Sequence, residues 1–193
     1  DYDHARFYRL DGSVEGTFHA VNLSSNVRVK SENPHGTRHH VAILKNATYD
    51  IRYVEFADGG RTTFAPIHNA IWLNDTTLQT HSINQIGRYA VHVHKGKNGG
   101  ILMGPVVHSL GTLQTAPGGP GLTHDPRRWG IVFHSACWWI ASQCVVHGFS
   151  GAGYALEEGN EAYAILEDCL ASRIGGTGTR DHIPTEAFNV GGH

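Results

Sequence analysis

A stretch of the chain recurs at intervals of about 22 to 25 residues, and this repeat limits the possible folds more than any other feature. When RWGIVFHSACWW is set above GAGYALEEGNE, Gly130 matches Gly153 and His134 matches Glu157. Each unit holds short runs in which apolar and polar residues alternate, and glycine, asparagine or serine ends each run. Alternation with a period of two predicts β-strands, and the turn residues predict that these strands are short.

Other segments fit the same frame once two insertions are allowed. The first insertion covers about residues 64–82 and the second covers residues 95–126. Units of this length, with short strands and glycine corners, bury little surface alone and form a continuous core when they are stacked. The matched pairs are Val91 with Ile131, His94 with His134, Lys45 with His134, Ala47 with Ala136, Ile51 with Ile140, Ile140 with Ile165, and Cys144 with Cys169.

We therefore predict an all-β fold, a parallel β-helix of about six coils with inserted loops, formed by residues 1–193 as a single domain. The alternative is an antiparallel sandwich or barrel, which needs tight two-residue turns between neighbouring strands. Signals for such turns are scarce apart from KNGG, so the β-helix is the favoured prediction.

The charge balance excludes one class of function. The sequence has 15 lysine and arginine residues against 17 aspartate and glutamate residues, a net charge of −2 with neutral histidines. A nucleic-acid-binding protein should carry a strongly basic face, so no nucleic-acid partner is expected. Residues 129–156 lack these charged residues, but they include His134, Gln143 and His147 and alternate like strands, so we predict no membrane span.

The repeat places histidines on one face of the predicted sheet. In YAVHVH, two valines alternate with His92 and His94, and residues two apart in a strand point to the same side. If the valines point inward, both histidines point outward. Matched positions on adjacent coils lie about 4.8 Å apart. His94, His134 and Glu157 would then form a column, with His92 beside it.

Such a column has three interpretations. Imidazoles and a carboxylate at this distance suit a divalent metal such as Zn²⁺, Mn²⁺ or Fe²⁺, with His92, His94, His134 and Glu157 as ligands. The column equally suits hydrolase or lyase chemistry, with His94, His134 and Glu157 as catalytic residues and a nearby cation stabilising negative charge. The third interpretation is a solvated face without a function.

The same alignment of repeats makes predictions for two further pairs of residues. Trp138 and Trp139 are adjacent in a predicted strand, so one indole must lie on each face and one is exposed. An exposed indole could stack on a sugar or be covered by a loop. Cys144 and Cys169 match on successive coils, where they would form either a ladder of reduced thiols or a disulfide.

The segments LSSNVRVKSENPHGTRHHV, DIRYVEFADGGRTT, NQIGRYAVHVH, RWGIVFHSACWW and GAGYALEEGNE occur in this order. Together they resemble the right-handed parallel β-helix region of the cell-surface and secreted hyaluronan-depolymerising proteins and their bacterial secreted relatives, over roughly residues 20 to 175. The resemblance implies a secreted protein that acts on an acidic polysaccharide such as hyaluronan, assisted by calcium or another metal. The site residues that it implies are Arg38, His40, Arg61, Arg88, His92, His94, His134 and Glu157 or Glu158.

The sequence thus predicts an extracellular β-helix that binds and cleaves an acidic glycan at a histidine-rich, metal-binding face. Arg38, Arg61, Arg88 and Trp138 are the expected substrate-binding residues, because guanidinium groups bind carboxylates through paired hydrogen bonds. The alternatives are a non-catalytic glycan-binding or adhesion module and a purely structural solenoid. The end AFNVGGH would leave a coil edge open, so we also expect further coils or a larger assembly.

Overall fold

The computed structural model describes residues 2–8, 14–21, 25–63, 65–109, 129–174 and 188–189, and every strand lies in these ranges. The described residues contain strands, turns and bends and no helix, so the prediction of an all-β protein is confirmed. None of them forms a helix long and apolar enough to cross a membrane.

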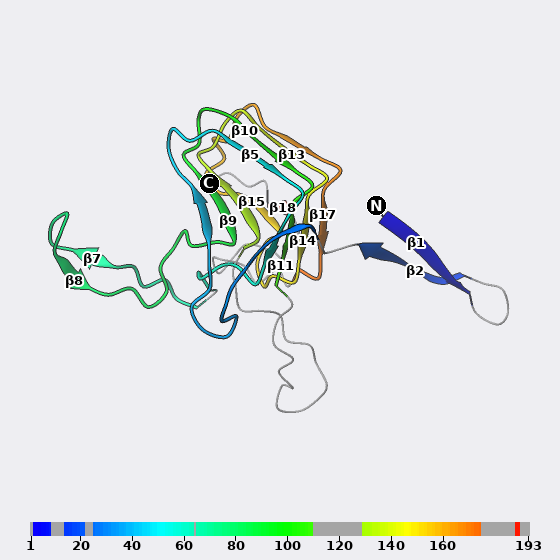
Figure 1. Cartoon of the computed structure of the whole chain (residues 1–193), viewed down its shortest axis with the longest axis horizontal. Helices are drawn as coiled ribbons and strands as arrows, with labels where there is room; N and C mark the ends of the chain where they lie inside the picture. The colour runs from blue at the N-terminus through cyan, green and yellow to red at the C-terminus, as the bar shows by residue number, and fades with distance from the viewer. Residues whose placement is uncertain are drawn as a thin grey trace.

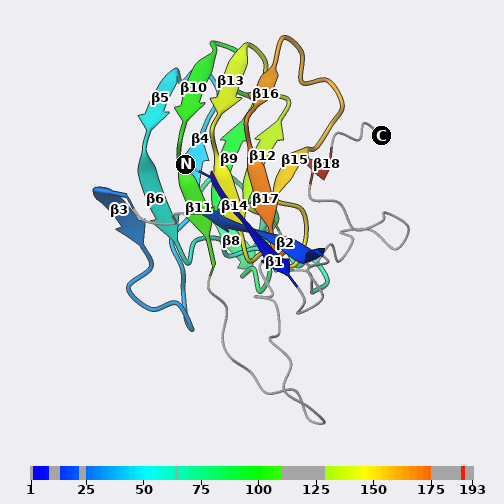
Figure 2. The same cartoon turned by 90° about the vertical axis from the view of Figure 1, so that its right-hand side faces the viewer.

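Most strands belong to three parallel sheets, whose strands lie side by side in Figure 2. Sheet I contains β4 (Val41–Ile43), β9 (Val91–His94), β12 (Ile131–His134), β15 (Tyr154–Leu156) and β18 (Phe188–Asn189). Sheet II contains β5 (Tyr49–Arg52), β10 (Gly100–Met103), β13 (Trp139–Ser142) and β16 (Ile165–Glu167). Sheet III contains β3 (Val27–Lys30), β6 (Val54–Ala57), β11 (Val106–His108), β14 (Val145–His147) and β17 (Leu170–Ser172).

The chain visits these sheets in a fixed order, I then II then III (Figure 1). The complete passes are β4–β5–β6, β9–β10–β11, β12–β13–β14 and β15–β16–β17. In every sheet, strands from successive passes are hydrogen-bonded neighbours, and each of these pairings is parallel. Four passes are therefore complete in the described part of the chain, where about six coils were predicted.

Two antiparallel ribbons stand apart from the sheets. One pairs β1 (Tyr2–Tyr8) with β2 (Val14–Val21), and the other pairs β7 (Ile71–Trp72) with β8 (Leu78–Thr80). The β7–β8 ribbon lies inside the first predicted insertion and extends away from the three sheets in Figure 1. The second insertion was predicted to start too early, because β10 begins at Gly100 and residues 95–99 form an ordinary turn before it. Residues 100–109 of that insertion form β10, β11 and the residues around them, and its residues 110–126 lie outside the described residues.

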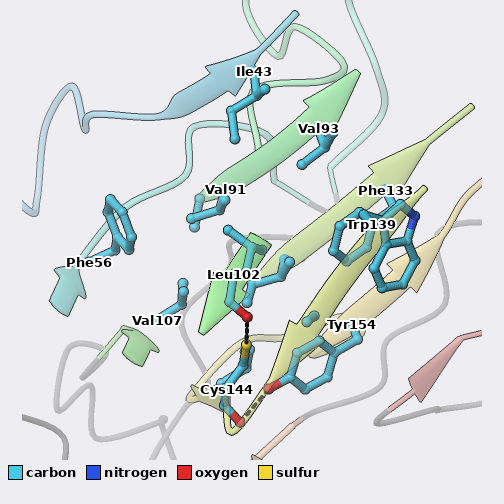
Figure 3. Close-up of a cluster of buried hydrophobic side chains, with 14 of the residues drawn as sticks. Ile43, Phe56, Val91, Val93, Leu102, Val107, Phe133, Trp139, Cys144 and Tyr154 are labelled. Carbon is cyan, nitrogen blue, oxygen red and sulfur yellow. Dashed lines mark hydrogen bonds between the residues drawn. The ribbon is translucent and has the colours of Figure 1, made fainter. Parts of the chain in front are cut away.

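One hydrophobic core receives side chains from all three sheets (Figure 3). Val91 and Val93 are fully buried, which confirms that the valines of β9 point inward. Phe133 of sheet I stacks on Trp139 of sheet II, with ring centroids 3.6 Å apart and planes 7° from parallel. Each large side chain buried in this way contributes about 1.5–3 kcal/mol of transfer free energy. Stacked passes thus produce the continuous core that a single pass could not.

The observed register confirms most of the predicted matches. His134 pairs with His94, and Ile140 pairs with Ile165. The match of residues 45–51 was wrong by one position, because Val41 pairs with Val91 and Leu44 therefore comes level with His94. Asp50 likewise lies level with Ile101, which pairs with Ile140. Lys45 is thus not part of the histidine column. The match was made by the identity of the residues and not by the face on which they lie. A shift of one residue moves a side chain to the opposite face of a sheet.

Cys144 and Cys169 directly precede the paired residues Val145 of β14 and Leu170 of β17, and both are free thiols in the structure. A hydrogen bond with Cys169, reinforced by burial, raises the pKa of Cys144, and the same hydrogen bond lowers the pKa of Cys169. The Cys144 thiol also lies 3.6 Å from the carbonyl oxygen of Leu102 (Figure 3). The structure therefore has the reduced ladder, one of the two predicted alternatives.

Candidate metal centre

Three histidines converge on the outward side of sheet I. His92 and His94 come from β9, and His134 comes from the neighbouring position on β12. One ring nitrogen of each lies within 4.8 Å of the corresponding nitrogens of the other two. The closest pair is His94 Nδ1 and His134 Nδ1, at 3.2 Å. The predicted histidine column is therefore present, and His92 joins it.

His92 is buried, with 4% of its surface exposed, so a solvated outward residue is the wrong description of it. Its Nδ1 donates a hydrogen bond to the carbonyl oxygen of Gly87 at 2.7 Å. A carbonyl can only accept, so the proton of neutral His92 lies on Nδ1 and Nε2 carries a lone pair. Within the described part of the chain, Nε2 is buried and has no hydrogen-bond partner. A backbone carbonyl that orients a histidine in this way is typical of metal sites.

The residues that follow the first insertion contact His92 through Gly87. The chain before the insertion joins the chain after it where Arg61 N donates to Arg88 O at 2.7 Å and the Thr62 hydroxyl donates to Gln85 O at 2.7 Å. The chain then reaches Gly87, whose φ of +81° is the left-handed conformation that glycine adopts readily. This conformation directs the Gly87 carbonyl at His92. The turn between the first insertion and β9 therefore orients the histidine.

His134 has acceptors on both ring nitrogens. Glu158 Oε1 lies 2.9 Å from Nε2, and Glu157 Oε2 lies 3.2 Å from Nδ1. A neutral imidazole has one proton, so if Nε2 donates to Glu158, the Nδ1 lone pair faces a carboxylate. That contact is favourable only if His134 is protonated or if another cation lies beside Nδ1. Glu157 was predicted as a ligand, and the structure places it against one of the three histidines.

The pKa values keep His92 and His94 neutral near pH 7. Burial lowers the pKa of His92 to about 4, and the charges of His94, His134 and His40 act in the same direction against the hydrogen bond to Gly87. Burial also lowers the pKa of His94, followed by the effects of His134 and Lys95. A metal binds only neutral imidazole, so both side chains are in the form that a metal requires.

Two of the predicted arginines approach this group. Burial lowers the pKa of His40, and the charges of Arg61 and Arg88 lower it further. The charge of His40 in turn lowers the pKa of His92. Arg61 and Arg88 thus gather on the same side of the molecule as the histidines. Arg38 does not, because it is buried and donates to the carbonyl of Pro34 at 2.6 Å and to the hydroxyl of Ser109 at 3.0 Å.

The two tryptophans lie on opposite faces, as predicted. Trp139 is 1% exposed in the core, whereas Trp138 is 59% exposed. Trp138 stacks on Tyr163, another exposed ring, with centroids 3.9 Å apart and planes 9° from parallel. Sequence reasoning missed Tyr163 and the role of Gly87. Tyr163 precedes Ala164 and Ile165 as Trp138 precedes Trp139 and Ile140, so a closer comparison of matched turns would have found it.

Two of the separations around His134 are close to those between neighbouring ligands of a tetrahedral ion. Four ligands at the usual zinc–nitrogen and zinc–oxygen distances of about 2.0–2.2 Å are about 3.3–3.6 Å from one another in a tetrahedron. The separations from His134 Nδ1 to His94 Nδ1 and to Glu157 Oε2 are both 3.2 Å.

Comparison of the chain with protein-family models, curated proteins and solved structures finds no match.

Proposed function

We propose that the three sheets are the faces of a right-handed parallel β-helix, related to the hyaluronan-depolymerising proteins that the sequence resembles. The fixed order of visits to the sheets and the parallel pairing of successive passes support this architecture. A solenoid of this kind presents long rows of side chains at matched positions. Such rows suit the recognition of an extended polymer.

The site on this solenoid binds a divalent metal through His92, His94 and His134, with Glu157 as a further ligand. The observation that carries this proposal is the pair of 3.2 Å separations around His134 Nδ1, one to His94 Nδ1 and one to Glu157 Oε2. One proton can join only two of these three atoms, whereas one metal ion can bind all three. The buried and unpartnered Nε2 of His92 supports it, because an isolated polar atom in the interior is costly unless a ligand satisfies it. Zinc suits three histidines and a carboxylate best, while manganese and iron accept the same ligands.

The protein is an extracellular enzyme that binds and cleaves an acidic glycan at this face. A divalent ion there would act as a Lewis acid and stabilise negative charge. Arg61 and Arg88 would hold substrate carboxylates, because their charges already act on the adjacent His40. Glu158 would hold the proton of His134 on Nε2 and thereby keep Nδ1 directed at the centre of the group.

The test is elemental analysis after exchange into Zn²⁺, Mn²⁺ or Ca²⁺ and dialysis, for the wild type and for His94→Ala/His134→Ala. His35→Ala/His81→Ala removes the same number of imidazoles from exposed positions and is the matched control. The expected result is about one equivalent of metal in the wild type and the control, and none in the site variant. Each protein is then incubated with hyaluronan, and chain length, new reducing ends and unsaturated uronate are measured.

The outcomes separate the parts of the proposal. No bound metal under any of these conditions would overturn the metal centre. Bound metal without any shortening of hyaluronan or of other uronate polymers would overturn the cleavage and leave a metal-binding adhesion module. Shortening that survives in His94→Ala/His134→Ala would place the chemistry elsewhere on the molecule.

A further inference from the structure

Lysines gather at the edge of sheet I where its strands end. Lys45 lies two residues after the end of β4, Lys95 directly follows β9, and Lys97 comes two residues later. Parallel strands of one sheet end at the same edge, so the three lysines reach one hollow of about 420 Å³. The hollow is lined by Lys45, Asn46, Lys95, Lys97, Ser135, Cys137 and Asn160.

The three lysines of this hollow form no ion pair with any residue that the structure describes. Among the residues that the structure describes, no ion pair or hydrogen bond engages the ammonium groups of Lys45, Lys95 or Lys97. The carboxylates on the next pass have other partners. Glu158 faces His134, and Glu161 Oε1 accepts hydrogen bonds from the backbone amides of Ser135 and Glu158, while Glu161 Oε2 is buried without a hydrogen-bond partner among the described residues. Three free cations around one concave surface form a site for an anion.

The hollow adjoins the histidine group on one side. Lys95 directly follows His94 in the chain, and Ser135 directly follows His134. The Lys95 charge contributes to the lowered pKa of His94, after burial and His134, so the two side chains are within electrostatic reach. A ligand held by the lysines would therefore extend to the candidate metal centre.

An exposed aromatic surface adjoins the hollow on the other side. Cys137 lines the hollow, and the next residue is Trp138, whose ring stacks on Tyr163. Trp138 has a φ of +61° and Tyr163 a φ of +56°, so both residues lie in the left-handed region and project from matched turns. Aromatic rings with free faces bind the apolar faces of sugar rings.

We propose that the hollow between Lys45, Lys95 and Lys97 is a subsite for the acidic group of a glycan, either a carboxylate or a sulfate. The polymer then extends from the hollow over His94 and His134 on one side and towards the stacked rings of Trp138 and Tyr163 on the other. This inference rests on the proposed function, because it supplies that function with the residues that select an anionic substrate. Lysine suits the role since its three donors form charge-assisted hydrogen bonds with either group in several orientations.

The test measures calorimetric binding of three oligosaccharides of equal length, from hyaluronan, from heparin and from chitin. The hyaluronan piece carries carboxylates, the heparin piece also carries sulfates, and the chitin piece is neutral. The variants are Lys45→Gln, Lys95→Gln and Lys97→Gln, alone and combined. Lys30→Gln, which removes an exposed charge from β3 in sheet III, is the control. Zinc content is measured for every variant.

We expect the wild type to bind an acidic oligosaccharide and not the neutral one. Each single variant should weaken that binding about 1.4- to fivefold, the range of an exposed ion pair, and the triple variant should weaken it more than any single variant, by about threefold or more. Lys30→Gln should change nothing, and zinc content should stay at the wild-type level. A preference for heparin over hyaluronan would identify sulfate as the group bound, and the reverse would identify carboxylate.

Two results would overturn the inference while leaving the proposed function intact. One is unchanged binding of the acidic oligosaccharide by the triple variant. The other is equally tight binding of a single-stranded oligonucleotide that competes with the glycan, because the lysines would then attract any polyanion. If the wild type binds none of the three oligosaccharides, the glycan-binding function itself is wrong and the subsite is wrong with it.

Discussion

His94 and His134 occupy matched positions on β9 and β12, and their Nδ1 atoms lie 3.2 Å apart. Two neutral imidazoles at this distance must either share one proton or direct two lone pairs at one cation. The partner of His134 Nε2 is Glu158, which favours a lone pair on Nδ1. The spacing of two neighbouring parallel strands therefore creates a centre that can hold either a proton or a metal ion.

Replacing Glu158 with Gln should weaken metal binding without removing a ligand. The carboxylate holds the His134 proton on Nε2, and an amide in its place offers a weaker acceptor and a competing donor. We expect zinc affinity to fall about 10- to 100-fold, measured by competition with a chromophoric chelator. Glu167→Gln, at an exposed position on β16, should leave the affinity unchanged. Equal affinities for the two variants would contradict the orienting role of Glu158.

The metal-free protein should lose stability as the pH falls from about 6.5 towards 4. Burial lowers the pKa of His92 from 6.5 to about 4, so the unfolded chain binds more protons than the folded one between these values. Stability is therefore complete above the unfolded pKa and is lost through this window, by up to about 3 kcal/mol. Urea unfolding in the presence of a chelator measures it. The pH dependence should be smaller in His92→Gln and unchanged in His81→Gln, and a dependence in His92→Gln equal to that of the wild type would refute the assignment.

Gly87→Ala should damage the metal centre through the backbone. Gly87 has a φ of +81°, which costs an alanine about 1–2 kcal/mol, and relief of this strain would turn the carbonyl away from His92. Gly99→Ala is the control, since Gly99 has a φ of +84° and an added Cβ would meet the carbonyl of Trp138 at 2.9 Å. Both variants should unfold at lower urea concentration, and zinc affinity should fall in Gly87→Ala alone. A similar fall in Gly99→Ala would mean that general destabilisation, and not the carbonyl of Gly87, weakens the site.

Much of the sheet register could be predicted from the sequence because buried positions constrain it. The valines of β9 and the matched Ile131 and Phe133 of β12 must face the core, so His94 and His134 must share the other side. The same reasoning failed for residues 45–51. There β5 reads YDIR, and Tyr49 and Ile51 face the core while Asp50 and Arg52 form an exposed ion pair. Matching the faces of β5, instead of the identity of Ile51, would have given the correct register.

The environment of His92 could not be predicted, because a turn outside the repeat sets it. No repeat unit indicates that Gly87, in the turn before β9, places its carbonyl against His92. The lysine hollow was missed for a different reason. Lys95 and Lys97 lie in a turn that was assigned to an insertion, so their place beside the end of β9 was not considered. Patterns predict which residues share a strand face, whereas turns and insertions depend on three-dimensional contacts.

The neighbouring residues Trp138 and Trp139 should respond very differently to alanine substitution. Trp139 is buried and stacks on Phe133, so Trp139→Ala removes a large core side chain and should cost about 3–5 kcal/mol. Trp138 is exposed and stacks on Tyr163, so Trp138→Ala should cost about 1 kcal/mol or less, the usual energy of an aromatic pair. Urea unfolding followed by circular dichroism measures both changes. Comparable losses would show that the Trp138–Tyr163 stack stabilises the fold, and its exposed rings would then be a structural feature with no need of a sugar to explain them.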